Sequence, residues 1–310
     1  MTFLKLFETL YDKFLSDKTK ERSERAILSI AISSFIIHLT IIYLVDFGMI
    51  SLNEPSDLLS HPIAAIYTPF SFILLYEVYL LIYYLPKSFT TYIGKQYEIM
   101  TLIVIRRLFK DLSHLAITPD WFSVNYNLQF TYDLVTSILM FFLIYLFYIQ
   151  SKKVYSSIVL HKIQIVSLSR FVQIKKLMAT FLVPVFVLLA IYSFANWLIQ
   201  IIYPQENITN SFSNINNIFF EQFFTFLIFA DVFLLLFSFF ITNEFHKVMR
   251  NSGFIISTIL IRLSFSVSGF LNNLLIVCAI IFGLLIIIVH NKFEKIIAVE
   301  KNNANNLHES

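Results

Sequence analysis

Cysteine, glycine and charged residues are all scarce in this chain of 310 residues. A single cysteine, Cys278, excludes an internal disulfide framework and any metal site built from several cysteines. Only 14% of the residues are charged and 57% are apolar, whereas soluble domains carry about 25% charged residues. With 35 Phe and only 5 Gly, this composition predicts an all-α polytopic membrane protein whose main partner is the lipid bilayer.

Motifs that carry out catalysis or hold a cofactor are missing as well. The sequence contains no H-E-x-x-H, G-x-S-x-G or C-x-x-C motif and no glycine-rich phosphate-binding loop. Two aspartates in apolar segments, Asp133 and Asp231, lack the G-x-G-D context of intramembrane aspartyl proteases, since the second stands in IFADV. We therefore expect no enzyme, no cofactor, no metal site and no nucleic-acid partner.

Eight apolar segments define the predicted membrane topology. Six of them are long enough to cross about 30 Å of hydrocarbon, and two others, at 97–115 and 253–267, are shorter or interrupted by charge. Both ambiguous segments have to cross as well, because only then do all the basic loops lie on one side. The six long segments are 26–47, 63–85, 127–149, 177–201, 218–241 and 271–289.

Lysine and arginine are concentrated on one side of this topology. Nineteen of the 23 lie in the termini and in the loops on that side. The other four are Arg106, Arg107, Lys110 and Arg262, inside the two ambiguous spans. Because basic loops face the cytoplasm, we expect a cytoplasmic-type membrane, inner or plasma, with the N and C termini both cytoplasmic.

The eight spans divide into two similar halves. FSFILLYEVYLLIYYL aligns without gaps with FTFLIFADVFLLLFSF, which places Glu77 on Asp231. YEIMTLIVIRRLF aligns with GFIISTILIRLSF, which places Arg106 on Arg262. An acid matching an acid and an arginine matching an arginine, in the same order, indicate an internal repeat. An even number of spans in each half predicts two parallel four-helix repeats.

The repeats and the segments around them give the predicted domain organisation. Apolar residues near the N-terminus recur at helical spacing opposite charged ones, which favours an amphipathic helix on the membrane surface. A cytosolic helix folded back on the protein is the alternative. The five predicted parts are 1–25 as this helix, 26–152 as repeat 1, 153–176 as a basic cytoplasmic linker helix, 177–292 as repeat 2 and 293–310 as a disordered cytoplasmic tail.

Ionisable residues inside the spans form the candidate functional site. At 1.5 Å per residue, Glu77 and Arg106 lie about 12 and 13 Å from the cytoplasmic boundary, and Asp231 and Arg262 about 15 and 13 Å. A charge at the centre of a span costs about 2.5–3.5 kcal/mol, so we expect these residues to pair between helices. The candidate intramembrane polar site comprises Glu77, Arg106, Arg107, Lys110, Asp111, Asp133, Asp231 and Arg262.

Further pairings are expected nearer the outer face. Lys110 and Asp133 fall at a similar height, and Arg107 and Asp111 stand one helical turn apart. His38 is the one deep histidine, and the sequence leaves open whether it relays protons or packs. The stripe Tyr76, Tyr79 and Tyr83 has two interpretations: hydrogen bonds into the charged site, or packing and interface anchors.

Two functions fit this pattern. The first is movement of ions or protons across the membrane through the charged site between helices. The alternative is a non-transporting membrane scaffold or sensor subunit, whose basic surfaces at 5–25 and 152–176 dock cytoplasmic partners or anionic lipid. The identity of the ion and the oligomeric state, a homo-oligomer included, are open at this point.

Overall fold

The computed structural model describes most of the chain, and the described residues form helices and connecting turns without a strand. The all-α prediction is therefore confirmed for this part of the molecule. The described residues are 2–49, 62–112, 115, 119–152, 162–202, 211–240, 244–267 and 269–308.

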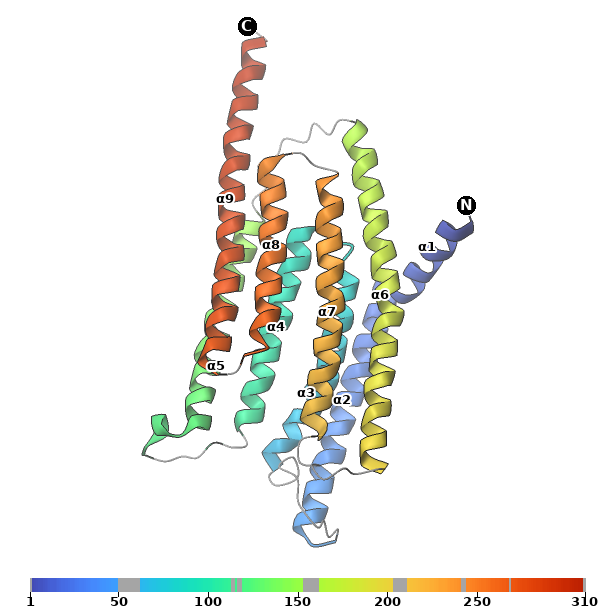
Figure 1. Ribbon diagram of the computed structural model, residues 1–310, viewed down its shortest axis with the longest axis vertical. Coiled ribbons are helices and arrows are strands. Elements are labelled where there is room, and N and C mark those ends of the chain that lie inside the picture. Colours follow the sequence, from blue (N-terminus) through green and yellow to red (C-terminus); the bar gives the residue numbers. More distant parts are fainter. Residues whose placement is uncertain are drawn as a thin grey trace. The chain divides into compact units, whose positions relative to one another are not determined.

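Each predicted span overlaps one of the long helices α2 to α9 over most of its length (Figure 1). The helices are α1 (Thr2–Phe14), α2 (Asp17–Asp46), α3 (Tyr67–Tyr84), α4 (Phe89–Leu112), α5 (Asn125–Ser151), α6 (Lys162–Ile202), α7 (Ser211–Phe239), α8 (Phe245–Ser264) and α9 (Phe270–His308). Two short 3₁₀ helices, η2 (Pro62–Ile66) and η3 (Trp121–Ser123), precede α3 and α5.

Among the described residues, five helices are long and apolar enough to cross a membrane. These candidate spans are Phe7–Asp46, Asn125–Ser151, Ser169–Tyr192, Gln222–Phe239 and Phe270–Glu300. The chain is therefore a multi-pass membrane protein. The apolar part of α3 is shorter, and charged residues lower the hydropathy of α4 and α8, so the count of eight spans stays a prediction.

Large apolar side chains cover the outer faces of these helices. Phe141 on α5 is 74% exposed and Leu188 on α6 is 66% exposed. Ile32 on α2 and Phe229 on α7 are also exposed. In water such faces would be costly, whereas in a bilayer they contact acyl chains. The exposed apolar faces thus agree with contact between these helices and lipid.

The chain folds into two compact units whose segments alternate along the sequence. Both units take residues from each half of the chain, so the division into repeats at 26–152 and 177–292 stays a prediction. Unit 1 consists of Met1–Tyr83, Leu102–Leu134 and Lys176–Leu227, and unit 2 consists of Tyr84–Thr101, Val135–Lys175 and Ile228–Ser310.

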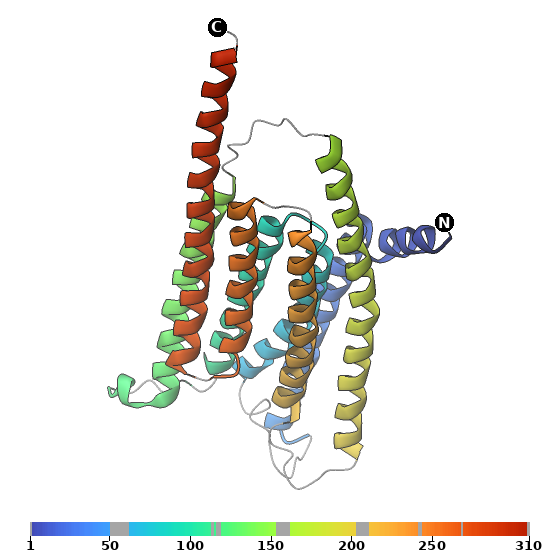
Figure 2. The same ribbon diagram turned by 45° about the horizontal axis from the view of Figure 1, so that its top comes forward.

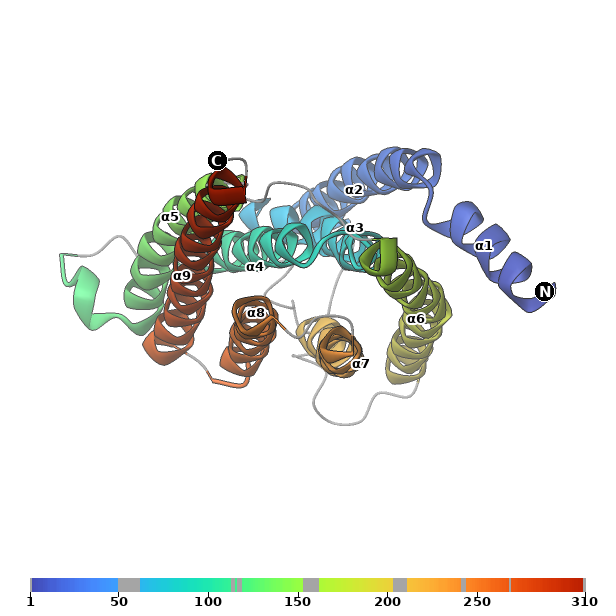
Figure 3. The ribbon, with the colours of Figure 1, turned by 90° about the horizontal axis from the view of Figure 1, so that it is seen from above.

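In unit 1 the N-terminal segment forms two helices in place of the single helix expected over 1–25. α1 ends at Phe14, and α2 begins at Asp17 after the N-cap residue Ser16. The Ser16 hydroxyl accepts a hydrogen bond from the backbone N–H of Thr19 at 3.3 Å, which satisfies a donor at the start of α2. Figures 2 and 3 show α1 turning away from the axis of α2.

The tyrosine stripe of α3 binds the beginning of the chain within unit 1. Each of its three hydroxyl groups donates a hydrogen bond to α1 or to the charged first turns of α2. This arrangement supports the interpretation of the tyrosines as anchors. The pairs are Tyr76 with Glu24 at 2.9 Å, Tyr79 with the carbonyl oxygen of Phe14 at 2.9 Å, and Tyr83 with Asp17.

In unit 2, α8 and α9 run antiparallel and pack along each other (Figures 1 and 2). Gly269, at φ +74°, lies in the turn between them, a backbone conformation that favours glycine. Gly283 on α9 leaves room for the buried Tyr97 of α4, because a Cβ there would lie 1.9 Å from the tyrosine oxygen. That oxygen is 2.7 Å from Oγ of Ser257 on α8.

The C-terminal end of the described chain differs from its prediction. The sequence predicts disorder over 293–310, whereas α9 remains helical to His308. The segment after Gly283 contains neither glycine nor proline, so nothing in it breaks the helix. At 1.5 Å per residue, the 39 residues of α9 extend about 58 Å, roughly twice the hydrocarbon thickness. Its last turns therefore project beyond the bilayer.

Candidate functional site

Three carboxylates of the predicted site are deeply buried in the helices. Glu77 is 6% exposed, and Asp133 and Asp231 are 0% exposed. A carboxylate buried in this way needs a charged or hydrogen-bonding partner, because the cost of removing it from water is several kcal/mol. Asp133 and Asp231 each form an ion pair with an arginine of the same compact unit, and the charge of Arg106 acts on Glu77 within unit 1.

In unit 2, Asp231 of α7 forms an ion pair with Arg262 of α8. Nη2 of the arginine lies 2.9 Å from Oδ2 of the aspartate, and the two side chains are 2% and 0% exposed. The same Nη2 donates a hydrogen bond of 2.8 Å to Oε1 of Gln96, and the hydroxyl of Tyr92 donates one of 2.9 Å to Oδ1 of Asp231. Both carboxylate oxygens are therefore bound.

Tyr92 and Gln96 are the members of this network that sequence reasoning missed. They stand four residues apart on α4, and both contact Asp231. Both residues precede the predicted span 97–115, whereas α4 already begins at Phe89. Their i, i+4 spacing was a signal in the sequence, because it places two polar side chains on one helix face.

In unit 1, Arg107 of α4 binds Asp133 of α5. Nη2 of the arginine donates to Oδ1 of the aspartate at 2.7 Å, and Nε donates to Oδ2. Nε2 of Gln129, one turn before Asp133, donates to the same Oδ1 at 2.8 Å. The guanidinium thus binds both carboxylate oxygens, which is the strongest geometry for this pair.

Asp133 has a partner, Arg107, that its height did not indicate. The sequence predicts Lys110 near Asp133 and a pair of Arg107 with Asp111, and both stay predictions, while the structure adds the bond between Arg107 and Asp133. On a single helix, an arginine that precedes its acid by four residues has the less favourable orientation for an ion pair. The bond from Arg107 to Asp133 on α5 instead uses two guanidinium nitrogens and both carboxylate oxygens. The side chain of Lys110 lies outside the described residues, and Asp111 is half-buried on α4.

The remaining pair, Glu77 of α3 and Arg106 of α4, also belongs to unit 1. The two residues interact electrostatically. His38 of α2 is in the same unit, and its Nδ1 lies 2.5 Å from Oγ1 of Thr68. A hydrogen bond to a neighbouring threonine agrees with the packing interpretation of this histidine.

Comparison with known proteins identifies no relative of this chain. No protein-family model matches it, and no match to a curated protein or to a solved structure was found. The buried ion pairs of the two units, with their hydrogen-bond partners, are therefore the observations from which a function has to be argued.

Proposed function

We propose that this membrane protein moves ions or protons across the bilayer through its buried charge pairs. The observation that carries the proposal is the burial of Glu77, Asp133 and Asp231, each at most 6% exposed, in apolar helices. Ionisable groups in such segments are expensive and mark ion or proton paths more often than other positions do. Glu77 with Arg106 is the proposed core of the path.

The proposed topology has eight spans, arranged as two parallel four-helix repeats in a cytoplasmic-type membrane, with both termini in the cytoplasm. Two features support it. The 24 residues of α4 extend about 36 Å, which is sufficient to cross. In both proposed repeats an acid on one helix interacts with an arginine on the next, as Glu77 with Arg106 and Asp231 with Arg262.

In the proposed transport step, the transported cation or proton competes with Arg106 for the carboxylate of Glu77. At rest the arginine neutralises Glu77, so the pair is stable at low dielectric. An arriving cation or proton binds the carboxylate and weakens its attraction for the arginine. When the ion leaves on the other side, the pair forms again. Lys110 and Asp133 are proposed to lie near the outer mouth of the same path.

Flux into liposomes tests this proposal. Purified protein would be reconstituted with a pH-sensitive or ion-sensitive dye inside, and uptake would be driven by a gradient of H⁺, Na⁺, K⁺ or Cl⁻. We expect flux for the wild type and its loss in Glu77→Gln. Glu98→Gln is the matched control, because Glu98 is 35% exposed and pairs with Lys95 at 2.6 Å. Absence of flux for every ion in folded wild type would contradict the proposal.

A second function is favoured by the completeness of the Asp231 network. Tyr92, Gln96 and Arg262 all bind this carboxylate, which is the arrangement of a pair that sets the register between helices. In this alternative the chain is a scaffold or sensor subunit, and its basic segments 5–25 and 152–176 dock cytoplasmic partners or anionic lipid. Sedimentation with anionic but not neutral vesicles, together with absent flux, would favour it.

A further inference from the structure

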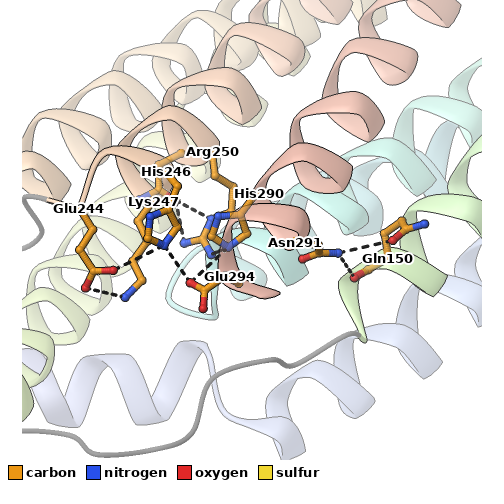
Figure 4. A network of polar contacts seen from close by, with 9 residues as sticks. Gln150, Glu244, His246, Lys247, Arg250, His290, Asn291 and Glu294 are labelled. Carbon is orange, nitrogen blue, oxygen red and sulfur yellow. Dashed lines mark hydrogen bonds and ion pairs between the residues drawn. The ribbon is translucent and has the colours of Figure 1, made fainter. Parts of the chain in front are cut away.

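A cluster of histidine and acidic side chains joins the beginning of α8 to the middle of α9 in unit 2 (Figure 4). His290 and Glu294 stand one turn apart on α9, so their side chains lie on the same face of the helix. His246, in the first turn of α8, meets them from the neighbouring helix. Both histidines are buried and Glu294 is half-buried.

The potential ligand atoms of these three residues converge. Nε2 of His246 lies 3.0 Å from Oε1 of Glu294, and Nε2 of His290 lies 3.9 Å from the same oxygen. All three ligand atoms lie within 4.8 Å of one another. The imidazole rings are stacked, with centroids 5.3 Å apart, so both nitrogens reach the carboxylate from one side.

We propose that His246, His290 and Glu294 bind a divalent transition-metal ion of the zinc class. Zinc takes imidazole nitrogens at about 2.0–2.1 Å and carboxylate oxygens at about 2.0–2.2 Å, so tetrahedral ligand atoms are separated by about 3.3–3.5 Å. The separations of 3.0 and 3.9 Å to the Glu294 oxygen bracket that range. Two imidazoles with one carboxylate select zinc-like ions over Mg²⁺ and Ca²⁺, which prefer oxygen ligands.

The fourth coordination position opens toward Glu244. Its Oε2 lies 3.5 Å from Nε2 of His246, while its other oxygen, Oε1, accepts from Lys247 at 2.9 Å. The Glu244 side chain is 44% exposed, so either this carboxylate or a water molecule completes a tetrahedral site. His290 comes 20 residues after the start of α9, a rise of about 30 Å. That rise equals the hydrocarbon thickness, so a crossing that begins with α9 brings the cluster to the edge of the bilayer, within reach of aqueous ions.

Arg250 competes directly with the ion. Its Nη1 lies 3.0 Å from Nε2 of His290, the atom assigned to the metal, and a guanidinium cannot itself be a ligand. Burial lowers the pKa of Arg250 from its ordinary value, and the Glu294 carboxylate opposes that shift. Two other nitrogens of Arg250 already donate to Oδ1 of Asn251, at 3.2 and 3.1 Å. Binding of the metal thus requires the guanidinium to withdraw from His290.

Because Arg250 competes with the ion, removing a ligand and removing Arg250 are expected to change the zinc affinity in opposite directions. The full chain, purified without a polyhistidine tag and stripped with a chelator, would be titrated with Zn²⁺ against a chromophoric competitor. We expect one ion per chain, bound on the order of 10- to 100-fold more weakly in His246→Ala and Glu294→Gln. We expect about tenfold tighter binding in Arg250→Gln, because a unit positive charge beside the ion is removed. A gain in affinity cannot result from misfolding.

Two further measurements sharpen the outcome. Co²⁺ in the same site is expected to give the intense visible absorption of four-coordinate cobalt, and Arg250→Gln retains that spectrum. His38→Gln is the matched control, since it removes a histidine of α2 that lies outside the cluster, and it should bind zinc as the wild type does. Wild type without stoichiometric zinc, unchanged binding in both ligand variants, or weaker binding in Arg250→Gln would each overturn the proposal.

Discussion

Removing one partner of the Asp231–Arg262 pair is expected to destabilise unit 2 more than removing both. Arg262→Met leaves a fully buried carboxylate without its counter-charge, and breaking a buried pair in this way costs about 3–5 kcal/mol. Asp231→Leu leaves the buried guanidinium with a similar cost. In the double variant no charge remains, and apolar side chains fill the space, so stability is expected to return close to that of the wild type.

Removing a single hydrogen bond of the network is expected to lower stability by less than removing a charge. Tyr92→Phe removes only the 2.9 Å bond to Oδ1 of Asp231, and a hydrogen bond to a charged group contributes about 1.5–3 kcal/mol. We therefore expect its destabilisation to be smaller than that of Arg262→Met. Arg25→Met, which removes a pair with Glu21 at 3.5 Å on an exposed face, is the control and is expected to cost about 0–1 kcal/mol.

The assay is a double-mutant cycle on reversible unfolding in detergent or bicelles, followed by circular dichroism. Because each single variant is expected to cost about 3–5 kcal/mol and the double variant almost nothing, we expect a coupling free energy of about 6–10 kcal/mol between Asp231 and Arg262. If the two single costs add in the double variant, the residues are not coupled, and the reasoning from burial fails. An Arg262→Met variant as stable as wild type would also refute it.

Three further outcomes are expected. Gly283→Ala is expected to cost about 1–3 kcal/mol in thermal unfolding, because its Cβ would lie 1.9 Å from the Tyr97 oxygen, and adding Tyr97→Phe should recover part of that loss. Ser16→Ala should lower stability by about 0.5–2 kcal/mol through loss of the N-cap of α2. In a Cys278→Ser background, a cysteine at Asp120 should react with an impermeant maleimide added outside intact cells, as the eight-span topology requires.

Each of these predictions has a matched control or a contradicting result. Gly94→Ala meets Tyr148 at 3.1 Å and is expected to cost less than Gly283→Ala. Ser29→Ala removes an exposed hydroxyl that bonds its own helix, and a loss equal to that of Ser16→Ala would argue against a capping role. Labelling of the position-120 cysteine only after cell lysis would remove the crossing by α4 and, with it, the proposed repeat.

Much of the fold was readable from the sequence because apolar run length limits where membrane helices lie. Each predicted span overlaps a long helix over most of its length, and the described residues contain helices without strands. Boundaries were less certain, because they depend on local bonds between side chains and backbone. The Ser16 cap divides the N-terminal segment, and the uninterrupted helix continues α9 to His308.

Which charged residues lie inside the apolar segments could be read from the sequence, and so could the pairing of Asp231 with Arg262, but the bond between Arg107 and Asp133 could not. A residue's position along a helix gives its depth in the membrane. Contact with a neighbouring helix also requires that its side chain lies on the helix face turned toward that neighbour. Asp133 illustrates the difference, since its height did not indicate the bond to Arg107 that the structure shows. Gln96, one residue before the predicted span 97–115, bonds Arg262, and nothing in its height along the chain indicated that contact.

The sequence by itself therefore determined the class of the protein, the positions of its helices and the burial of acids and arginines in them. These properties follow from transfer free energies, which are additive along a chain. Only the tertiary structure decided that Tyr92 and Gln96 complete the Asp231 network, and that His246 meets residues of α9 that are 44 and 48 positions away. Such contacts depend on how helix faces pack together, and short directional bonds cannot be read from hydropathy.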